Sequence, residues 1–279
     1  MQRSIHLTFG VLLIITLISL GSDASPSRTK RSPVTHGKDA QITEFPFFVS
    51  LELGLGYQLC GGAIISRHFV VTAAHCFKLS NNTDEYVIRA GTDQKGYGGT
   101  EHYIISLDKH PNYRTDRTNT PYNDIAVVGV KEPFKFDKYR EHNIPMFRAG
   151  DEVIPGTEAI IIGIGETENG PTDNLKSAVI KITEKSECMK AWFKIDSIPI
   201  PKSVICAGVG KDRRDACNHD SGSPLIVDGR LAGITSFGSI CGTPGTPGLY
   251  TEVSQFQKWV VQTIKFRMRF RMDWADSEF

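Results

Sequence analysis

Short apolar runs alternate with turn-forming residues along most of the chain. From about Phe45 onward, segments rich in Val and Ile are separated by clusters of Gly, Pro and Asn. Short strands at this regular spacing are typical of an all-β barrel or sandwich. Examples of the strands that this pattern predicts are Phe47–Leu53, Gly62–Ile65, Phe69–Thr72, Tyr86–Ala90, Ile125–Val130, Ala159–Ile164, Ser177–Ile182, Pro224–Val227, Leu231–Thr235 and Gly248–Val253.

Helical periodicity is clear only near the C-terminus. Ser254 can cap a helix there, and apolar residues follow at helical spacing: Phe256, Trp259, Val260 and Ile264. No strand–helix–strand alternation is present. Gly163-Ile164-Gly165 lacks the third glycine and the following helix of a dinucleotide-binding fold.

Basic and apolar residues alternate strictly over residues 265–272. We therefore separate a basic C-terminal extension, 265–279, from the folded domain that ends at 264. Three interpretations stay open for it: a solvated or frayed end, a basic amphipathic patch for an anionic surface, and a tail that is removed by proteolysis after arginine.

The N-terminus has the features of an export signal. Arg3 precedes an apolar run over residues 9–20, and small residues follow it up to Ala24. The run is too short to span a bilayer, so it predicts a signal peptide over 1–24, the alternative being a membrane anchor. No other segment approaches transmembrane length, and we expect a secreted, extracellular protein.

The polar segment 25–33, with Lys30-Arg31, predicts a propeptide, the alternative being a disordered leader.

Composition adds little to this picture. The residues are 40% hydrophobic and 23% charged, which is ordinary for a globular protein. The length of 279 residues allows one large all-β domain or two modest ones. The net charge of +1 gives no field that would recruit nucleic acid, so we expect no nucleic-acid partner.

The six cysteines predict disulfides in an exported chain. They are Cys60, Cys76, Cys188, Cys206, Cys217 and Cys241, and none forms the C-x-x-C pair of a zinc ribbon or a thioredoxin-type site. Spacing alone leaves their pairing open. The sequon Asn81-Asn82-Thr83 predicts a glycan on Asn81.

Three residues at separate strand–loop junctions suggest nucleophilic catalysis. Ser221 lies between Asp220 and a glycine, in a loop that can present a hydroxyl beside free backbone N–H groups. His75 ends one apolar run, and Asp124 begins another. Each signal is weak alone, because turn residues cluster in any loop and a single histidine is more often a core residue.

Several segments together resemble the trypsin/chymotrypsin family of serine endopeptidases: CGGAIIS, VTAAHC, NDIAV, CNHDSGSPL, GITSFG and PGLYTEV. The resemblance extends from Val34 to the terminal helix. It implies an all-β fold of two packed six-stranded antiparallel β-barrels with a C-terminal α-helix, and it makes 34–264 a trypsin-like serine protease domain. It also implies the disulfides Cys60–Cys76, Cys188–Cys206 and Cys217–Cys241.

The same resemblance assigns catalytic roles. Ser221 would be the nucleophile, His75 the general base and Asp124 the acid that orients it, acting through an acyl-enzyme intermediate. The backbone N–H groups of His219 and Ser221 would form the oxyanion hole. The family usually has glycine at the position of His219. Two outcomes therefore stay open: a working enzyme with altered access to its cleft, or an enzyme of weak activity. The alternative function is a serine protease homologue with weak or no activity that acts as a binding or regulatory protein.

Asp215 lies six residues before Ser221, at the position where the family resemblance implies the floor of the primary specificity pocket. A carboxylate in a narrow slot selects Arg or Lys, although a surface-loop charge is the alternative. The same resemblance implies four further substrate-binding positions: Ala216, Ser236, Gly238 and Gly248. Ala216 lacks a hydroxyl, which favours Arg, and the two glycines are small residues of the pocket wall. Ser236 begins the segment that would pair with the substrate backbone. Ile240 stands where trypsins usually have glycine and would narrow the entrance.

Activation in this family frees an apolar N-terminus whose amine pairs with an aspartate. Here those residues are Val34 and Asp220, yet the basic site ends two residues earlier, at Arg31. We therefore expect a zymogen that matures in two steps, by cleavage after Arg31 and then by removal of Ser32-Pro33.

The remaining expectations are mostly absences. Thr92 falls where some trypsins have a calcium-binding Glu, so we expect no metal, and no cofactor is implied. Expected partners are protein or peptide substrates and protein protease inhibitors. A monomer with a role in digestion, venom or saliva is the simplest expectation.

Overall fold

The computed structural model describes residues 34, 36–54, 56–137, 139–167, 170–196 and 198–275, with the backbone alone at 167, 196 and 270–275. The predicted signal peptide, 1–24, and the predicted propeptide, 25–33, lie outside the described residues. In this part of the chain no helix is both long enough and apolar enough to cross a membrane.

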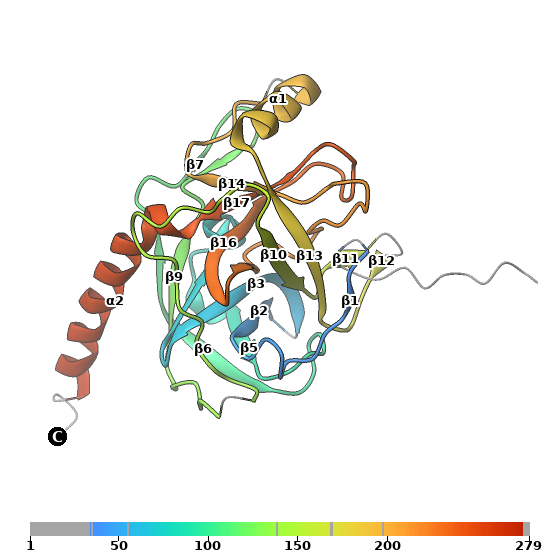
Figure 1. The fold of residues 1–279 in the computed structure, drawn as a ribbon. Coiled ribbons are helices and arrows are strands. Elements are labelled where there is room, and N and C mark those ends of the chain that lie inside the picture. Colours follow the sequence, from blue (N-terminus) through green and yellow to red (C-terminus); the bar gives the residue numbers. More distant parts are fainter. Residues whose placement is uncertain are drawn as a thin grey trace, which may run out of the picture. The chain divides into compact units, whose positions relative to one another are not determined.

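The first half of the chain forms a closed antiparallel barrel, shown in blue to green in Figure 1. Its strand order is β2-β3-β4-β9-β6-β5, and the barrel interior is filled by Val, Ile, Leu and Phe side chains. The strands are β2 (Phe48–Leu53), β3 (Tyr57–Ser66), β4 (Phe69–Thr72), β5 (Tyr86–Ala90), β6 (Thr100–Lys109) and β9 (Ala126–Val130).

The second half forms another barrel. The sheet order β13-β10-β15-β16-β17-β14 is closed because β14 pairs with Ile182 and Thr183 of β13, while β1 pairs with the other end of β13, at Lys176 and Ser177. The strands are β1 (Lys38–Asp39), β10 (Glu158–Gly163), β13 (Lys176–Thr183), β14 (Val204–Ala207), β15 (Pro224–Val227), β16 (Arg230–Phe237) and β17 (Gly248–Glu252). Two six-stranded antiparallel barrels with a C-terminal helix confirm the predicted fold class.

Smaller elements connect the barrel strands. The strand pairs are β7 (Arg114–Thr115) with β8 (Pro121–Tyr122), and β11 (Glu166–Thr167) with β12 (Gly170–Pro171). The short helices are η1 (Ala74–Phe77) and η2 (Thr83–Glu85), and the α-helices are α1 (Lys185–Asp196) and α2 (Val253–Ala275).

The sequence pattern missed α1 because little of this helix is buried. Cys188 and Trp192, one turn apart, are its fully buried side chains, whereas Met189 and Phe193 are mostly exposed. The apolar residues therefore do not form the one-sided stripe that predicts a helix. Strands β6 and β14 were also missed. Strand β6 carries charged residues at both ends, and β14 is only four residues long.

The C-terminal helix differs from the prediction at both ends. It begins at Val253, so Ser254 lies inside it rather than capping it, and its backbone stays helical to Ala275, past the expected boundary at 264. Arg267 makes two hydrogen bonds to Asp108 of β6, at 2.8 and 2.7 Å. The interpretation of this segment as a frayed end is therefore wrong for the described part. Alternation with a period of two does not indicate a helix, which explains the error.

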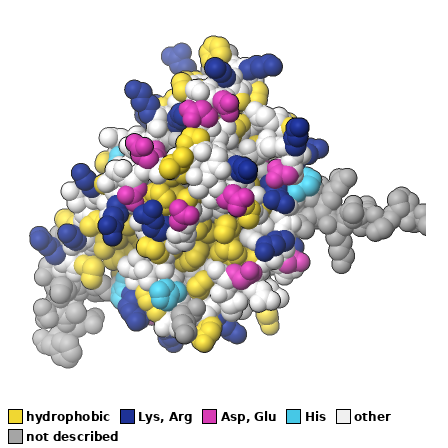
Figure 2. All heavy atoms as spheres, viewed as in Figure 1, with side chains coloured by type: hydrophobic (Ala, Val, Ile, Leu, Met, Phe, Trp, Pro, Cys, Tyr) yellow, Lys and Arg dark blue, Asp and Glu magenta, His cyan; other side chains and the backbone are white. Residues whose placement is uncertain are grey.

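Charged side chains of both signs are mixed on the molecular surface. On the face shown in Figure 2, Lys and Arg side chains lie among Asp and Glu side chains and around an apolar area. This mixture agrees with the net charge of +1. Because neighbouring charges of opposite sign cancel each other's field, this face offers little long-range attraction to an anionic polymer.

All six cysteines pair as the resemblance implies. Cys60–Cys76 joins β3 to η1, Cys188–Cys206 joins α1 to β14, and Cys217–Cys241 links two loops of the second barrel. The first of these bonds tethers the short helix that carries His75.

The two barrels meet at closely packed backbone. The Gly61 N–H of β3 donates to the Ser221 carbonyl at 2.7 Å, and Thr72 Oγ1 donates to the Gly61 carbonyl at 2.7 Å. A Cβ on Gly61 would overlap Ser223 Oγ, and one on Gly222 (φ +80°) would overlap Thr72 Oγ1 and the Gly61 oxygen. Only glycine fits at both positions, and this contact fixes Ser221 against the first barrel.

We predict that Gly61→Ala destabilises the fold, because its methyl group must displace the loop that carries Ser221. The expected loss is about 1–3 kcal/mol, measured by urea unfolding. Gly210→Ala is the matched control, since outside residues 209–211 the only described atom within 4 Å of its added methyl group is Asp212 Oδ1, at 3.5 Å. Equal unfolding midpoints for the two variants would show that the barrels do not depend on this contact.

Candidate active site

A cleft of about 320 Å³ brings the predicted site residues together. His75 reaches it from η1 of the first barrel, and Ser221 from the loop before β15 of the second. The five predicted substrate-binding residues also line it: Asp215, Ala216, Ser236, Gly238 and Gly248. Ile240 does not line the cleft and is 81% exposed, so the structure gives no support to a narrowed entrance.

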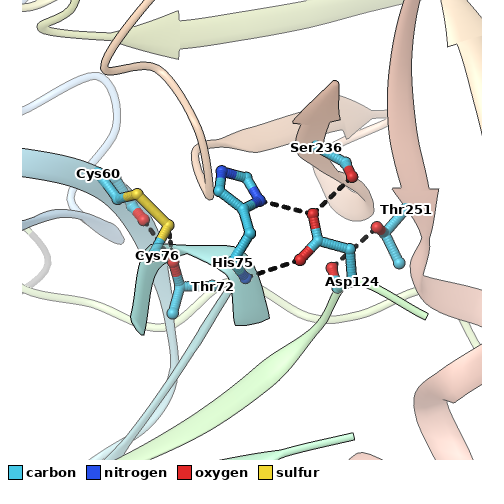
Figure 3. A network of polar contacts seen from close by, with 8 residues as sticks. Cys60, Thr72, His75, Cys76, Asp124, Ser236 and Thr251 are labelled. Carbon is cyan, nitrogen blue, oxygen red and sulfur yellow. Dashed lines mark hydrogen bonds and ion pairs between the residues drawn. A yellow bond between two sulfur atoms is a disulfide. The ribbon is translucent and has the colours of Figure 1, made fainter. Parts of the chain in front are cut away.

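Asp124 lies behind His75 and holds its ring (Figure 3). His75 Nδ1 and Asp124 Oδ2 are 2.6 Å apart, and the backbone N–H of His75 donates to Asp124 Oδ1 at 2.9 Å. Asp124 is only 1% exposed, whereas His75 faces the cleft. The two bonds fix both the position and the orientation of the imidazole.

Two hydroxyl groups that the sequence did not connect with Asp124 complete its surroundings. Ser236 Oγ donates to Asp124 Oδ2 at 2.6 Å, and Thr251 Oγ1 donates to the Asp124 backbone carbonyl at 2.9 Å (Figure 3). Burial on its own raises the pKa of Asp124, but the charge of His75 and the hydrogen bonds from His75 and Ser236 outweigh it and hold the pKa below its usual value. Asp124 is therefore ionised although buried.

The Ser221 hydroxyl shares the cleft with the free side of His75. No hydrogen bond joins Ser221 Oγ to His75 within the described residues. Such a bond is often long in a site without substrate and shortens when substrate binds. The structure thus brings all three predicted residues together, with the His75–Asp124 contact already formed.

The loop around Ser221 leaves particular backbone donors unused. The N–H groups of Cys217, Asp220, Gly222 and Ser223 all donate within the protein. Among the described residues, those of His219 and Ser221 have no acceptor. The N–H groups of His219 and Ser221 are therefore available to bind a negative oxygen beside Ser221.

His219 carries a strained backbone. Its φ is +67°, a region that favours glycine, and a side chain there costs about 1–3 kcal/mol. Its carbonyl accepts from Gln58 Nε2 at 3.4 Å, and its ring lies nearly perpendicular to the Tyr57 ring, with centroids 6.0 Å apart. Neither residue was foreseen, because no motif singles out this end of β3.

Asp215 is buried at the base of the cleft. It is 3% exposed, so the interpretation as a surface-loop charge is wrong. Burial raises its pKa to about 7, although hydrogen bonds from the Gly242 and Ala216 N–H groups oppose that rise. A Cβ on Gly248 would lie 3.0 Å from Asp215 Oδ1, so a larger residue there would crowd the carboxylate.

Asp220 is another buried carboxylate, and no ion pair to it is found in the described chain. Its oxygens accept from the N–H groups of Gly165 and Cys217, both at 2.9 Å. Burial raises its pKa to about 7, against the effect of these bonds. Val34 is 1% exposed in the core of the second barrel, and no ion pair joins it to Asp220 in the described, uncleaved chain.

One cluster within the described residues has metal-ligand atoms close together: Cys60, His75 and Cys76. Both sulfurs belong to a disulfide, so neither can act as the thiolate ligand that a metal needs. Asn81, the predicted glycosylation site, is exposed, and its Oδ1 accepts from Lys109 Nζ at 2.7 Å.

Comparisons with known proteins show similarity over most of the chain. The sequence model of the trypsin family matches residues 34–260. A trypsin of Saccharopolyspora erythraea is 32% identical over 83% of this chain and 98% of its own. A vitellin-degrading protease of Bombyx mori is 33% identical over 92% of this chain and 96% of its own.

A solved structure supports the same relationship. Neuropsin, a serine protease expressed in the limbic system of mouse brain, superimposes with a TM-score of 0.73 at 27% identity. The match covers 82% of this chain and 98% of the neuropsin chain.

Proposed function

The chain belongs to the trypsin family of serine endopeptidases, and we propose that it is a secreted enzyme that cleaves peptide bonds after arginine, and less readily after lysine. One observation carries this specificity: the buried Asp215 lines the same cleft as His75 and Ser221. Burial disfavours the charged form of Asp215, and a substrate cation beside it would stabilise that form.

The catalytic steps follow from the positions of the side chains. Ser221 Oγ attacks the substrate carbonyl while His75 takes its proton, and His75 then protonates the leaving amine. Water repeats the sequence on the acyl-enzyme, again through His75. Asp124 stabilises the imidazolium, and the free N–H groups of His219 and Ser221 bind the oxyanion.

The side chains around Asp215 favour arginine. Ala216 offers no hydroxyl to help the shorter lysine ammonium reach the floor. A planar guanidinium can instead make two parallel hydrogen bonds to one carboxylate. Gly238 leaves the wall open, since no described atom outside residues 237–239 lies within 4 Å of the point that a Cβ would occupy there.

Activation supplies the charged partner of Asp220. We propose that secretion removes 1–24, that cleavage after Arg31 follows, and that loss of Ser32-Pro33 frees the Val34 amine. This amine would pair with Asp220 and lower its pKa, because a nearby positive charge favours the ionised form. The uncleaved chain would stay inactive.

We predict that the processed enzyme hydrolyses an Arg substrate fastest, a Lys substrate more slowly and a Phe substrate least. Asp215→Ser should lower kcat/KM for the Arg substrate by at least about 100-fold, because the cation loses its buried partner. Fluorogenic peptides measure this. Preference for Phe would exclude the proposed specificity, and correctly processed protein that cleaves none of them would point to a binding homologue.

The raised pKa of Asp215 predicts a pH-dependent affinity for cations. Below pH 7 the free carboxyl is protonated and neutral, so a cation must displace its proton, and affinity falls as pH falls. The inhibition constant of benzamidine should rise about tenfold for each pH unit below 7. Asp215→Ser is the control and should give a flat, weak profile. A flat profile in the unmodified enzyme contradicts the prediction.

The two-step maturation predicts the N-terminus of the active form. Edman sequencing or mass spectrometry of active material should begin at Val34. Activity in material that begins at Ser32 would refute removal of the dipeptide, since an amine two residues further along cannot occupy the same buried position.

A further inference from the structure

A polar pair at the rim of the cleft connects two distant segments. The backbone N–H of Glu166, the first residue of β11, donates to the Asn218 carbonyl at 2.8 Å. In return Asn218 Nδ2 donates to Glu166 Oε2 at 2.7 Å. We call this reciprocal contact the 166–218 pair. Nothing in the sequence marks it, because its members are 52 positions apart.

The pair sets the direction of the peptide group between Asn218 and His219. In a trans peptide the carbonyl and the N–H point in opposite directions. The carbonyl oxygen faces Glu166 and packs so closely on Gly165 that a Cβ there would overlap it. The His219 N–H must therefore point away from β11, to the side where no described group accepts from it.

This peptide needs restraint because its neighbour is strained. His219 holds a φ of +67°, and rotation of the adjoining peptide is the simplest way to relieve that strain. Rotation would turn the Asn218 carbonyl toward the cleft, where its negative end would repel an oxyanion. From the first barrel, Gln58 restrains only the next carbonyl, through a long hydrogen bond of 3.4 Å.

We propose that Glu166 is a positioning residue: together with Asn218 it holds the His219 N–H in the direction that binds the oxyanion. The contact thereby compensates for the backbone strain of His219, which glycine at that position would not have. The inference rests on the proposed peptidase function. Glu166 does not line the cleft, so it acts through Asn218 and not by touching the substrate.

Paired substitutions at Glu166 separate this role from general packing. Glu166→Ala removes the acceptor of the Asn218 amide and should lower kcat for an Arg substrate about threefold to tenfold. Glu166→Gln keeps an oxygen acceptor and should retain most of the activity. The benzamidine inhibition constant should stay within about twofold in both variants, because that ligand fills the Asp215 pocket without using the oxyanion donors.

A double-mutant cycle with His219→Gly tests the compensation itself. With glycine at position 219 the backbone is no longer strained, so the peptide between residues 218 and 219 depends less on restraint by the 166–218 pair. Glu166→Ala should then cost less than about twofold in kcat. An equal loss of kcat in the parent enzyme and in the His219→Gly variant would overturn the proposal.

Amide hydrogen exchange distinguishes failure of the positioning role from failure of the proposed peptidase function. Amide hydrogen exchange of residues 217–221 should quicken in Glu166→Ala and stay unchanged in Glu166→Gln, whether or not the protein hydrolyses peptides. Unchanged exchange in Glu166→Ala overturns the positioning role. An inactive parent enzyme with the expected exchange pattern would instead refute the proposed function and leave the restraint of the loop established.

Discussion

The arrangement of the site depends on one close backbone contact between the barrels. The Gly61 N–H binds the Ser221 carbonyl, and the absence of side chains at Gly61 and Gly222 lets β3 and the Ser221 loop touch. His75 belongs to the first barrel, and its short helix is tied to β3 by Cys60–Cys76. The distance between the two predicted catalytic groups is thus fixed by the fold and not by a direct bond between them.

Three buried carboxylates around this contact have different surroundings and hence different charge states. Asp124 has His75 and Ser236 as partners, and its pKa lies below the usual value. Asp215 and Asp220 accept mainly from backbone N–H groups, and burial raises the pKa of each to about 7. In the proposed function each of these two gains a cation that the uncleaved, substrate-free chain lacks: Asp215 from the substrate and Asp220 from the freed N-terminus. The site is therefore incomplete until both arrive.

Much of this could be predicted from local sequence, and the limits have physical causes. The alternation of apolar runs with turn residues indicated an all-β fold, and the resemblance carried by the His75, Asp124 and Ser221 segments implied the two barrels, the cleft and the disulfide pairing. Helix α1 was missed because it buries few side chains, and the length of α2 because basic–apolar alternation has no helical period. The contacts of Ser236 with Asp124 and of Glu166 with Asn218 join distant segments, which no local pattern encodes.

Covalent labelling tests most directly whether this cleft is a working active site. A fluorophosphonate should modify Ser221 alone, in protein that begins at Val34 and not in the uncleaved chain, and His75→Ala should abolish the reaction. Peptide mapping by mass spectrometry locates the modified residue. Absence of label at Ser221 in correctly processed protein, or equal labelling of the uncleaved chain, would contradict the account.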